Sequence, residues 1–200
     1  MTEKEKMIAG KVYNSRDSEL VAALNKSKSL CRQYNNLDFS NVAARKVIID
    51  ELLQEEHNDG YCVFTPPFWC DYGFNVKVGK NFYSNHNLVI LDCAEVTFGD
   101  NVFVGPNCGF YTAIHPIDAH QRNTGIELAK PIKVGSDVWF GGGVTVLPGV
   151  TIGDNVVIGA GSVVVKDIPS GVVAVGNPCK PIRKITEADK LDLDLSLIHI

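Results

Sequence analysis

The sequence predicts a mainly β protein, a parallel β-helix built from six-residue repeats, with a small helical region at its N-terminus. Three observations lead to this fold class. Hexads repeat in register in the C-terminal half, apolar residues early in the chain recur with the period of a helix, and one polar segment interrupts the repeats. We expect a helical region over 1–60, a β-helix over 61–185 with a protruding loop at 116–133, and a tail over 186–200.

The composition suits one folded domain that stays in the cytoplasm. The chain has 200 residues, of which 45% are hydrophobic and 21% charged. The net charge of −4 argues against nucleic acid, because binding to phosphate backbones requires a basic face. No apolar run approaches the roughly 18 residues of a membrane helix, and no apolar secretion segment follows the Lys/Glu-rich start. The six cysteines include no C-x-x-C pair and are expected as core thiols.

The first part of the chain is predicted to be helical. Thr2 followed by Glu5 fits a capping box at the start of a first helix. Apolar residues between 20 and 30 fall on one face of a second helix. From Val42 to Leu53 apolar residues recur at steps of one, three and four, which indicates a third, amphipathic helix closed by Asn58-Asp59-Gly60.

Six consecutive hexads align between residues 134 and 169. Their first place is always a large apolar residue, their fifth is Val, Ile or Ser, and Gly holds the second place in four of the six. The pattern recurs upstream at Val78-Gly79, Phe98-Gly99 and Val104-Gly105. Each unit supplies a short strand and a corner at which the second-place glycine allows a tight or left-handed backbone. Three units would form a triangular coil of about 18 residues, and coils would stack. An antiparallel sandwich with Gly-rich turns is the alternative.

The repeat breaks once, between His115 and Val134. The intervening segment 116–133 is polar and has no hexad pattern. A polar insertion that leaves a rigid solenoid is expected to be a loop that carries function. The tail 191–200 alternates apolar and polar residues like a strand, and its role stays open.

These features resemble a known enzyme family. The hexads, the break after Thr112-Ala-Ile-His-Pro116 and the segment Asp137-Val-Trp139 resemble the hexapeptide-repeat acyltransferases. Asp71-Tyr-Gly73, Asn81 to Asn85 and Gly176-Asn-Pro178 make the chain similar to the maltose and galactoside O-acetyltransferase branch over about residues 2–185. The resemblance implies a left-handed β-helix, acetyl-CoA as cosubstrate, no required metal, and a homotrimer with active sites between subunits.

The resemblance also implies catalytic roles. His115 matches the general base that takes the proton of an attacking hydroxyl, a role that suits imidazole near neutral pH. Gly142 matches a backbone amide that stabilises the oxyanion, and Asn85 matches a hydrogen-bonding residue near the histidine and the acceptor. Direct attack needs no acyl-enzyme, and the sequence has no G-x-S-x-G elbow.

Asp17, Asp71 and Glu127 match positions that face acceptor hydroxyls or orient the histidine. Carboxylates accept hydrogen bonds from vicinal hydroxyls, so they suit a sugar acceptor. In the family, galactoside-acetylating members typically have a small hydroxyl residue in place of Asp71 and an apolar one in place of Glu127, so the resemblance implies the maltose or glucose type. Asp17 could equally be the N-cap of the helix that follows it. Trp139 is expected to pack on the pantetheine arm or the acceptor, because the sixth hexad place points outward. The physiological acceptor and the hydroxyl that is acetylated stay open.

Coenzyme A is anionic, so a net acidic chain needs a local basic patch to bind it. Positions that match family contacts to phosphates, pantetheine or adenine are Lys166, Lys180, Arg183, Ala160 and Pro178, together with Trp139 and Gly142. Val165 departs from the family, in which threonine is common, and loses a hydroxyl contact worth about 1 kcal/mol.

Two alternatives belong to other classes. His115 and His120 are spaced like the zinc ligands of γ-class carbonic anhydrases, which share this solenoid. The third ligand would be His86, but its separation from His115 does not match a coil of about 18 residues. A non-catalytic scaffold is the second alternative, and it predicts no affinity for coenzyme A. Bound zinc would support the first alternative, and coenzyme A binding would exclude the second.

Overall fold

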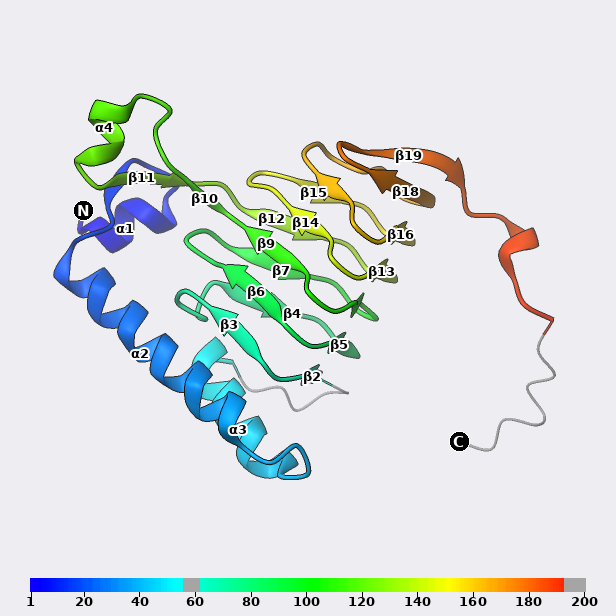
Figure 1. Cartoon of the computed structure of the whole chain (residues 1–200), viewed down its shortest axis with the longest axis horizontal. Coiled ribbons are helices and arrows are strands. Elements are labelled where there is room, and N and C mark those ends of the chain that lie inside the picture. The colour runs from blue at the N-terminus through cyan, green and yellow to red at the C-terminus, as the bar shows by residue number, and fades with distance from the viewer. Residues whose placement is uncertain (56–61, 193–200) are drawn as a thin grey trace.

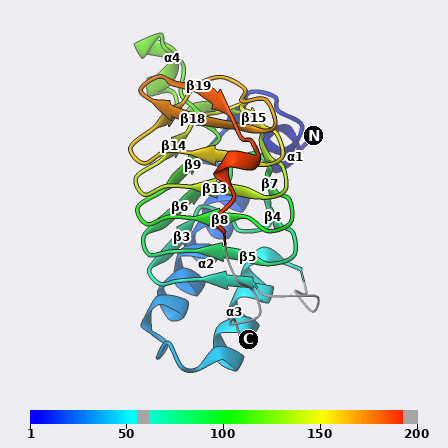
Figure 2. The same ribbon diagram turned by 90° about the vertical axis from the view of Figure 1, so that its right-hand side faces the viewer.

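The protein is a parallel β-helix whose first coil is covered by helices. The structure, a computed structural model, describes residues 1–55 and 62–192. Between Cys62 and Val175 the strands of successive coils pair in parallel, as Figures 1 and 2 show from two sides. The predicted parallel β-helix is therefore confirmed, and the parallel pairing excludes an antiparallel sandwich.

Three helices precede the coils. They are α1 (Glu3–Ile8), α2 (Ser18–Asn36) and α3 (Val42–Leu53). Thr2 and Glu5 form the predicted capping box of α1, and Asp17 caps α2 by accepting a hydrogen bond from the Glu19 N–H. Helix α3 ends earlier than expected, at Leu53, because Gln54 adopts a left-handed backbone. The predicted closure at 58–60 lies outside the described residues.

The β-helix has three faces, each a parallel sheet. The first face contains β4 (Val76–Val78), β7 (Val96–Phe98), β12 (Ile132–Val134) and β15 (Thr151–Ile152). The second contains β3 (Phe68–Cys70), β6 (Leu88–Leu91), β9 (Gly109–Tyr111), β14 (Thr145–Val146) and β17 (Val163–Val164). The third contains β2 (Cys62–Phe64), β5 (Phe82–Ser84), β8 (Phe103–Val104), β13 (Val138–Phe140), β16 (Val156–Ile158) and β18 (Val172–Gly176), and β19 (Cys179–Lys184) closes it in antiparallel.

The coils differ in length. Near the C-terminal end Val157 pairs with Val173, which gives a coil of 16 residues (173 − 157). Lys133 pairs with Thr151, which gives the predicted coil of 18 residues (151 − 133) in the C-terminal part. Tyr83 pairs with Phe103, which gives a coil of 20 residues (103 − 83) upstream. The single predicted length was therefore wrong for the upstream coils, whose two extra residues blur the hexad pattern there.

The core is filled by the predicted places of the hexads. First-place and fifth-place side chains from Val134 to Ile168 are buried. Towards the N-terminal end the core contains a column of phenylalanine rings whose centroids lie 4.5 to 5.2 Å apart. The members of that column are Phe68, Phe64, Phe82, Phe98, Phe110 and Phe140. Leu52, Leu53 and Tyr34 extend the same core into the helical region.

The second-place glycines act differently from the prediction. Left-handed backbone occurs at the fourth place of the hexad, for example at Asp137, Gly143 and Asn155. The second-place glycines allow neighbouring coils to approach closely, since a Cβ on Gly141 would lie 2.6 Å from the Ala160 nitrogen. Side-chain hydrogen bonds connect fourth-place residues across coils, as from Asn101 to Asp137 at 2.9 Å.

Replacing Gly135 by alanine is expected to lower the free energy of unfolding by about 2–3 kcal/mol. A Cβ there would lie 2.8 Å from the Gly153 carbonyl carbon of the next coil. That contact is with backbone, which cannot shift as a flexible side chain could. Urea unfolding measures the loss. Lys133→Ala, at an exposed position of β12 two residues earlier, is the control and should change stability by less than about 0.5 kcal/mol. Equal stabilities for the two variants would contradict this role of the glycine.

The interruption of the repeats is an arm with its own structure. It contains β10 (Ala113–Ile114), the short helix α4 (Ala119–Asn123) and β11 (Ile126–Ala129). Strand β11 pairs antiparallel with β10 and with β1 (Tyr13–Asn14) of the N-terminal segment. The predicted loop at 116–133 is therefore a small antiparallel sheet with a helical tip, which projects from the coils in Figure 1.

A short 3-10 helix, η1 (Glu187–Asp189), follows β19. Residues 193–200 of the predicted tail lie outside the described residues. Among the helices that the structure describes, none is both long and apolar enough to cross a membrane.

Candidate functional site

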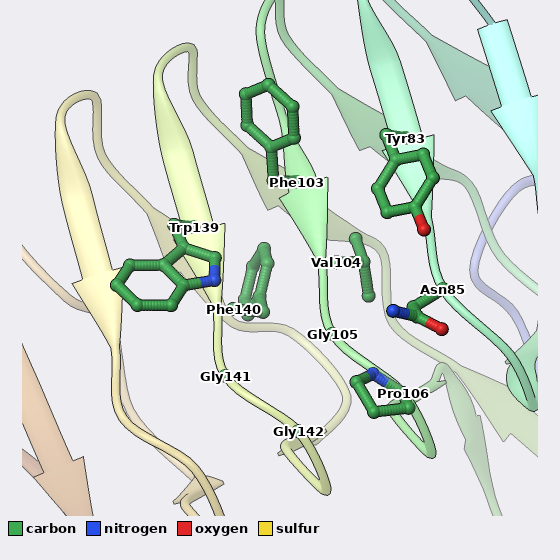
Figure 3. Close-up of a pocket in the computed structure, with 10 residues that line it drawn as sticks. All are labelled: Tyr83, Asn85, Phe103, Val104, Gly105, Pro106, Trp139, Phe140, Gly141 and Gly142. Atoms are coloured by element: carbon green, nitrogen blue, oxygen red, sulfur yellow. The ribbon is translucent and has the colours of Figure 1, made fainter.

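The predicted site residues divide into two groups within one chain. The first group lies in a pocket on the third face, between β5, β8 and β13, and contains Asn85, Trp139 and Gly142 (Figure 3). The second group lies on the arm and the adjoining coil and contains His115, Glu127 and Asp71. Among the described residues that line the pocket, none comes from the arm. In Figure 1 the arm and the third face lie on different sides of the β-helix.

An aromatic stripe runs along the pocket. Tyr83, Phe103 and Trp139 stand opposite one another in the register of β5, β8 and β13. Trp139 is 56% exposed and Phe103 is 50% exposed, so the predicted outward orientation of Trp139 is confirmed. Tyr83 and Phe103 were not predicted as site residues. Both occupy the sixth place of an upstream hexad, as Trp139 does in its own hexad. This shared place could have identified them as outward-facing residues beside Trp139.

The pocket offers hydrogen-bond donors at its corner. Within the described residues, the Gly142 N–H has no hydrogen-bond partner, whereas its carbonyl accepts from the Gly161 N–H at 2.9 Å. The Ala160 N–H, one coil further on, is also unpartnered within those residues. The Asn85 Oδ1 accepts from the His86 N–H, which leaves the Asn85 amide nitrogen as a donor. Such donors can bind the acceptor oxygens of a ligand.

On the arm, His115 follows β10 and faces a carboxylate on β11. The His115 Nδ1 lies 3.9 Å from the Glu127 Oε1. The imidazole is 59% exposed, whereas the Glu127 side chain is only 16% exposed. The other carboxylate oxygen of Glu127 accepts a hydrogen bond of 2.8 Å from the Tyr13 hydroxyl. A carboxylate in this position can stabilise a protonated imidazole.

Asp71 lies beside the same cluster. The Cys93 thiol donates to its Oδ2 at 3.8 Å. Burial raises the pKa of Asp71, and Lys28 acts in the opposite direction. The charge of Glu127 also raises the pKa of Asp71, so the two carboxylates are close enough to interact.

A residue that the sequence analysis missed, Asp92, fixes the turn that carries Asp71. Its buried carboxylate accepts hydrogen bonds from the backbone N–H groups of Asp71, Tyr72 and Gly73 at 2.7 to 2.9 Å. Burial raises the pKa of Asp92 to about 6, and hydrogen bonds from the Tyr72 and Gly73 N–H groups act in the opposite direction. The hint in the sequence is an acidic residue at the end of a fully apolar strand, Leu88–Leu91.

Asp92→Asn is expected to lower the free energy of unfolding by about 2–4 kcal/mol. The substitution replaces one buried carboxylate oxygen by an NH2 group, which would then face a backbone N–H group without an acceptor between them. We also expect a weaker apparent affinity for the acceptor, since the Asp71 turn loses its anchor. Urea unfolding at neutral pH measures the stability. Asp100→Asn is the matched control, since Asp100 is exposed and also accepts a backbone N–H, that of Lys80. A loss no larger than that of the control would contradict the anchoring role.

The residues predicted to bind coenzyme A lie near the C-terminal end of the β-helix. Ala160 and Lys166 follow β16 and β17, and Lys180 and Arg183 lie on β19. The side chains of Lys166 and Lys180 are exposed, without an ion-pair partner in the described ranges. Arg183, in contrast, is paired with Asp189 at 2.7 Å. Pro178 lies in the turn that connects β18 and β19.

The three histidines of the zinc alternative lie on different elements of the fold, and His115 follows β10. His120 lies in α4, and the His86 Nδ1 contacts the Pro66 carbonyl oxygen. In the part of the chain that the structure describes, no group of three His, Cys, Asp or Glu side chains is arranged to hold a metal ion.

Two family models and a known protein match this chain. The maltose acetyltransferase hexapeptide capping motif matches residues 6–56, and the bacterial transferase hexapeptide model matches residues 131–166. The chain is 50% identical over 190 residues to the "putative acetyltransferase YJL218W" of Saccharomyces cerevisiae, covering 92% of this chain and 94% of that protein.

Solved structures give the same result. A maltose O-acetyltransferase from Clostridium difficile 630 is 48% identical with a TM-score of 0.83, over 94% of this chain and 99% of that one. A galactoside acetyltransferase in complex with coenzyme A is 39% identical with a TM-score of 0.87, over 94% of each chain. A hexapeptide-repeat acetyltransferase from Vibrio cholerae, in complex with acetyl coenzyme A, is 34% identical with a TM-score of 0.85, over 94% of this chain and all of that one.

Proposed function

Because the chain belongs to the hexapeptide-repeat acetyltransferase family, we propose that it transfers the acetyl group of acetyl-CoA to a hydroxyl of a sugar of the maltose or glucose type. The observation that carries this proposal is the pairing of His115 with Glu127 on the arm, 3.9 Å apart. The similar structures from Vibrio cholerae and of the galactoside enzyme hold acetyl coenzyme A and coenzyme A, which supports acetyl-CoA as the donor.

In the proposed reaction His115 acts as general base. Its imidazole takes the proton of the acceptor hydroxyl while that oxygen attacks the thioester carbonyl carbon. Glu127, beside Nδ1, stabilises the imidazolium that forms. The unpartnered Gly142 N–H, with the Asn85 amide nearby, stabilises the oxyanion. His115 then returns the proton to the departing thiolate as the carbon–sulfur bond breaks. Acetyl-CoA supplies the activated carbonyl, so no acyl-enzyme is required.

The two groups of site residues support a homotrimer in which one subunit's arm meets a neighbour's third face. Within one chain His115 and the pocket with Asn85 and Gly142 do not share a cavity. The aromatic stripe and Ile117 near the arm's tip, which is 97% exposed, are apolar surfaces that a neighbour would cover. A closed ring of three subunits buries both kinds of surface in every copy.

The acceptor and donor bind to different parts of this proposed site. Asp71 and Glu127 accept hydrogen bonds from sugar hydroxyls. Asp17 caps α2 through one carboxylate oxygen, and its other oxygen can accept a hydrogen bond from the sugar in the same way. Trp139 packs on the pantetheine arm. Lys166 and Lys180 bind phosphates, and the Ala160 N–H and Pro178 contact pantetheine and adenine. Arg183 binds a phosphate only after its ion pair with Asp189 breaks.

The test is release of coenzyme A thiol from acetyl-CoA with a panel of maltose, glucose, galactosides and other hydroxylated compounds. A blank without acceptor accounts for the cysteines of the protein. We expect maltose or glucose to give the fastest acceptor-dependent release, with no loss of rate after treatment with a metal chelator. Saturable coenzyme A binding with release only for non-sugar acceptors would overturn the sugar class. No release and no coenzyme A binding would favour a scaffold, and a chelator-sensitive rate would favour the zinc alternative.

A further inference from the structure

The N-terminal segment is part of the arm that carries the proposed base. Strand β1 adds to the arm's sheet with Tyr13 opposite Glu127, 114 residues away in the sequence. The Ser15 N–H and hydroxyl both donate to the Gly125 carbonyl, at 3.1 and 3.0 Å. The segment therefore fixes β11, and with it Glu127, from the side opposite β10.

Tyr13 is the residue of this segment that points towards the site. Its side chain is only 1% exposed, and its hydroxyl donates to the Glu127 Oε2 at 2.8 Å. Burial raises the pKa of Tyr13 well above its usual value, and the neighbouring Cys93 and Glu127 act in the same direction. The hydroxyl therefore keeps its proton at working pH and acts as a permanent donor to the carboxylate.

The geometry assigns Tyr13 a role as a positioning residue: its hydroxyl holds one oxygen of Glu127 so that the other faces the His115 Nδ1. This inference rests on the proposed function, because it takes His115 as the base and Glu127 as its partner. Tyr13 itself acts through Glu127 and touches neither the acceptor nor the donor.

The need for such an anchor follows from the charges around Glu127. Its carboxylate lies on a flexible side chain near Asp71, and the two negative charges repel each other. At 3.9 Å the contact with an exposed imidazole is too long to fix the carboxylate alone. The hydrogen bond from Tyr13 is shorter and shielded from water, so it determines the orientation of the carboxylate.

A double-mutant cycle tests this role. Tyr13→Phe removes the hydroxyl and keeps the ring in the core. We expect kcat to fall about tenfold with an unchanged KM for acetyl-CoA, and we expect Tyr13→Phe to cause no further loss in a chain that already carries Glu127→Gln. Tyr72→Phe is the matched control, because Tyr72 is buried in the same cluster and its hydroxyl has no hydrogen bond within the described residues. We expect wild-type kcat for this control.

A second measurement does not depend on turnover. Nuclear magnetic resonance titration of the histidine rings gives the protonation midpoint of His115, with His120 as an internal control. Tyr13→Phe should move the His115 midpoint, leave that of His120 unchanged, and add nothing in the Glu127→Gln background. Additive effects of the two substitutions on kcat and on the midpoint, or no effect of Tyr13→Phe, would overturn the positioning role. Failure of the proposed function gives a different result. The wild type would then transfer no acetyl group, although Tyr13→Phe would still move the His115 midpoint only when Glu127 is present.

Discussion

Replacing His115 by alanine is expected to lower kcat for acetyl transfer at least about a hundredfold, the usual size of a general-base contribution. Binding of coenzyme A should change by less than about twofold, because the predicted donor contacts lie on the coils and not on the arm. The fall in kcat has a chemical reason, because without a base the acceptor oxygen must attack while it keeps its proton. Thiol release measures kcat, and calorimetry measures coenzyme A binding.

His120→Ala is the matched control for this variant. His120 lies on the same arm in the exposed helix α4, and it has no role in the proposed reaction. We expect its kcat to stay within about twofold of wild type. A His115→Ala enzyme that retains most of its activity would exclude His115 as the base, even if the chain transfers acetyl groups. Equal losses in the two variants would point to damage of the arm and not to removal of a base.

The sequence predicts the β-helix well because its repeat is local. Each hexad places a first residue such as Phe140 in the core and a fourth residue such as Asn155 at a left-handed corner, and both requirements repeat every six residues. The left-handed corner was predicted at the second-place glycine, but a glycine is needed there because the neighbouring coil leaves no room for a Cβ. Contacts between coils join residues 16 to 20 positions apart, or 36 across the arm, which is why the hexad pattern alone does not reveal them.

The candidate site depends on longer-range contacts, and it is predicted less completely. The resemblance identified His115 and Glu127 by matching positions, and the structure brings them together. The anchors of the site, Asp92 below Asp71 and Tyr13 behind Glu127, were not predicted. Each works through a hydrogen bond to a residue on another element, and neither stands in a motif with a known chemical meaning. Such residues become visible only when the fold places them beside a charge.

The division of the site between two surfaces predicts complementation between inactive chains. His115→Ala damages the arm, and Asn85→Ala damages the pocket on the third face. If each active site combines one subunit's arm with a neighbour's third face, trimers assembled at random from equal amounts of the two chains contain about one quarter intact sites. Homotrimers of either chain contain no intact site, and every mixed trimer contains one intact site out of three. We therefore expect coexpressed, doubly tagged trimers to recover about one third of wild-type activity, measured by thiol release.

The control for this experiment uses two substitutions on the same arm. His115→Ala and Glu127→Gln chains can never combine into an intact arm, because both residues belong to one subunit's arm in every site. Their mixed trimers should stay as inactive as the parent variants. Recovery by the first pair but not by the second requires that the two surfaces come from different subunits. If neither pair recovers activity although mixed trimers form, each site is built within one chain, and the arm must then move to reach its own pocket.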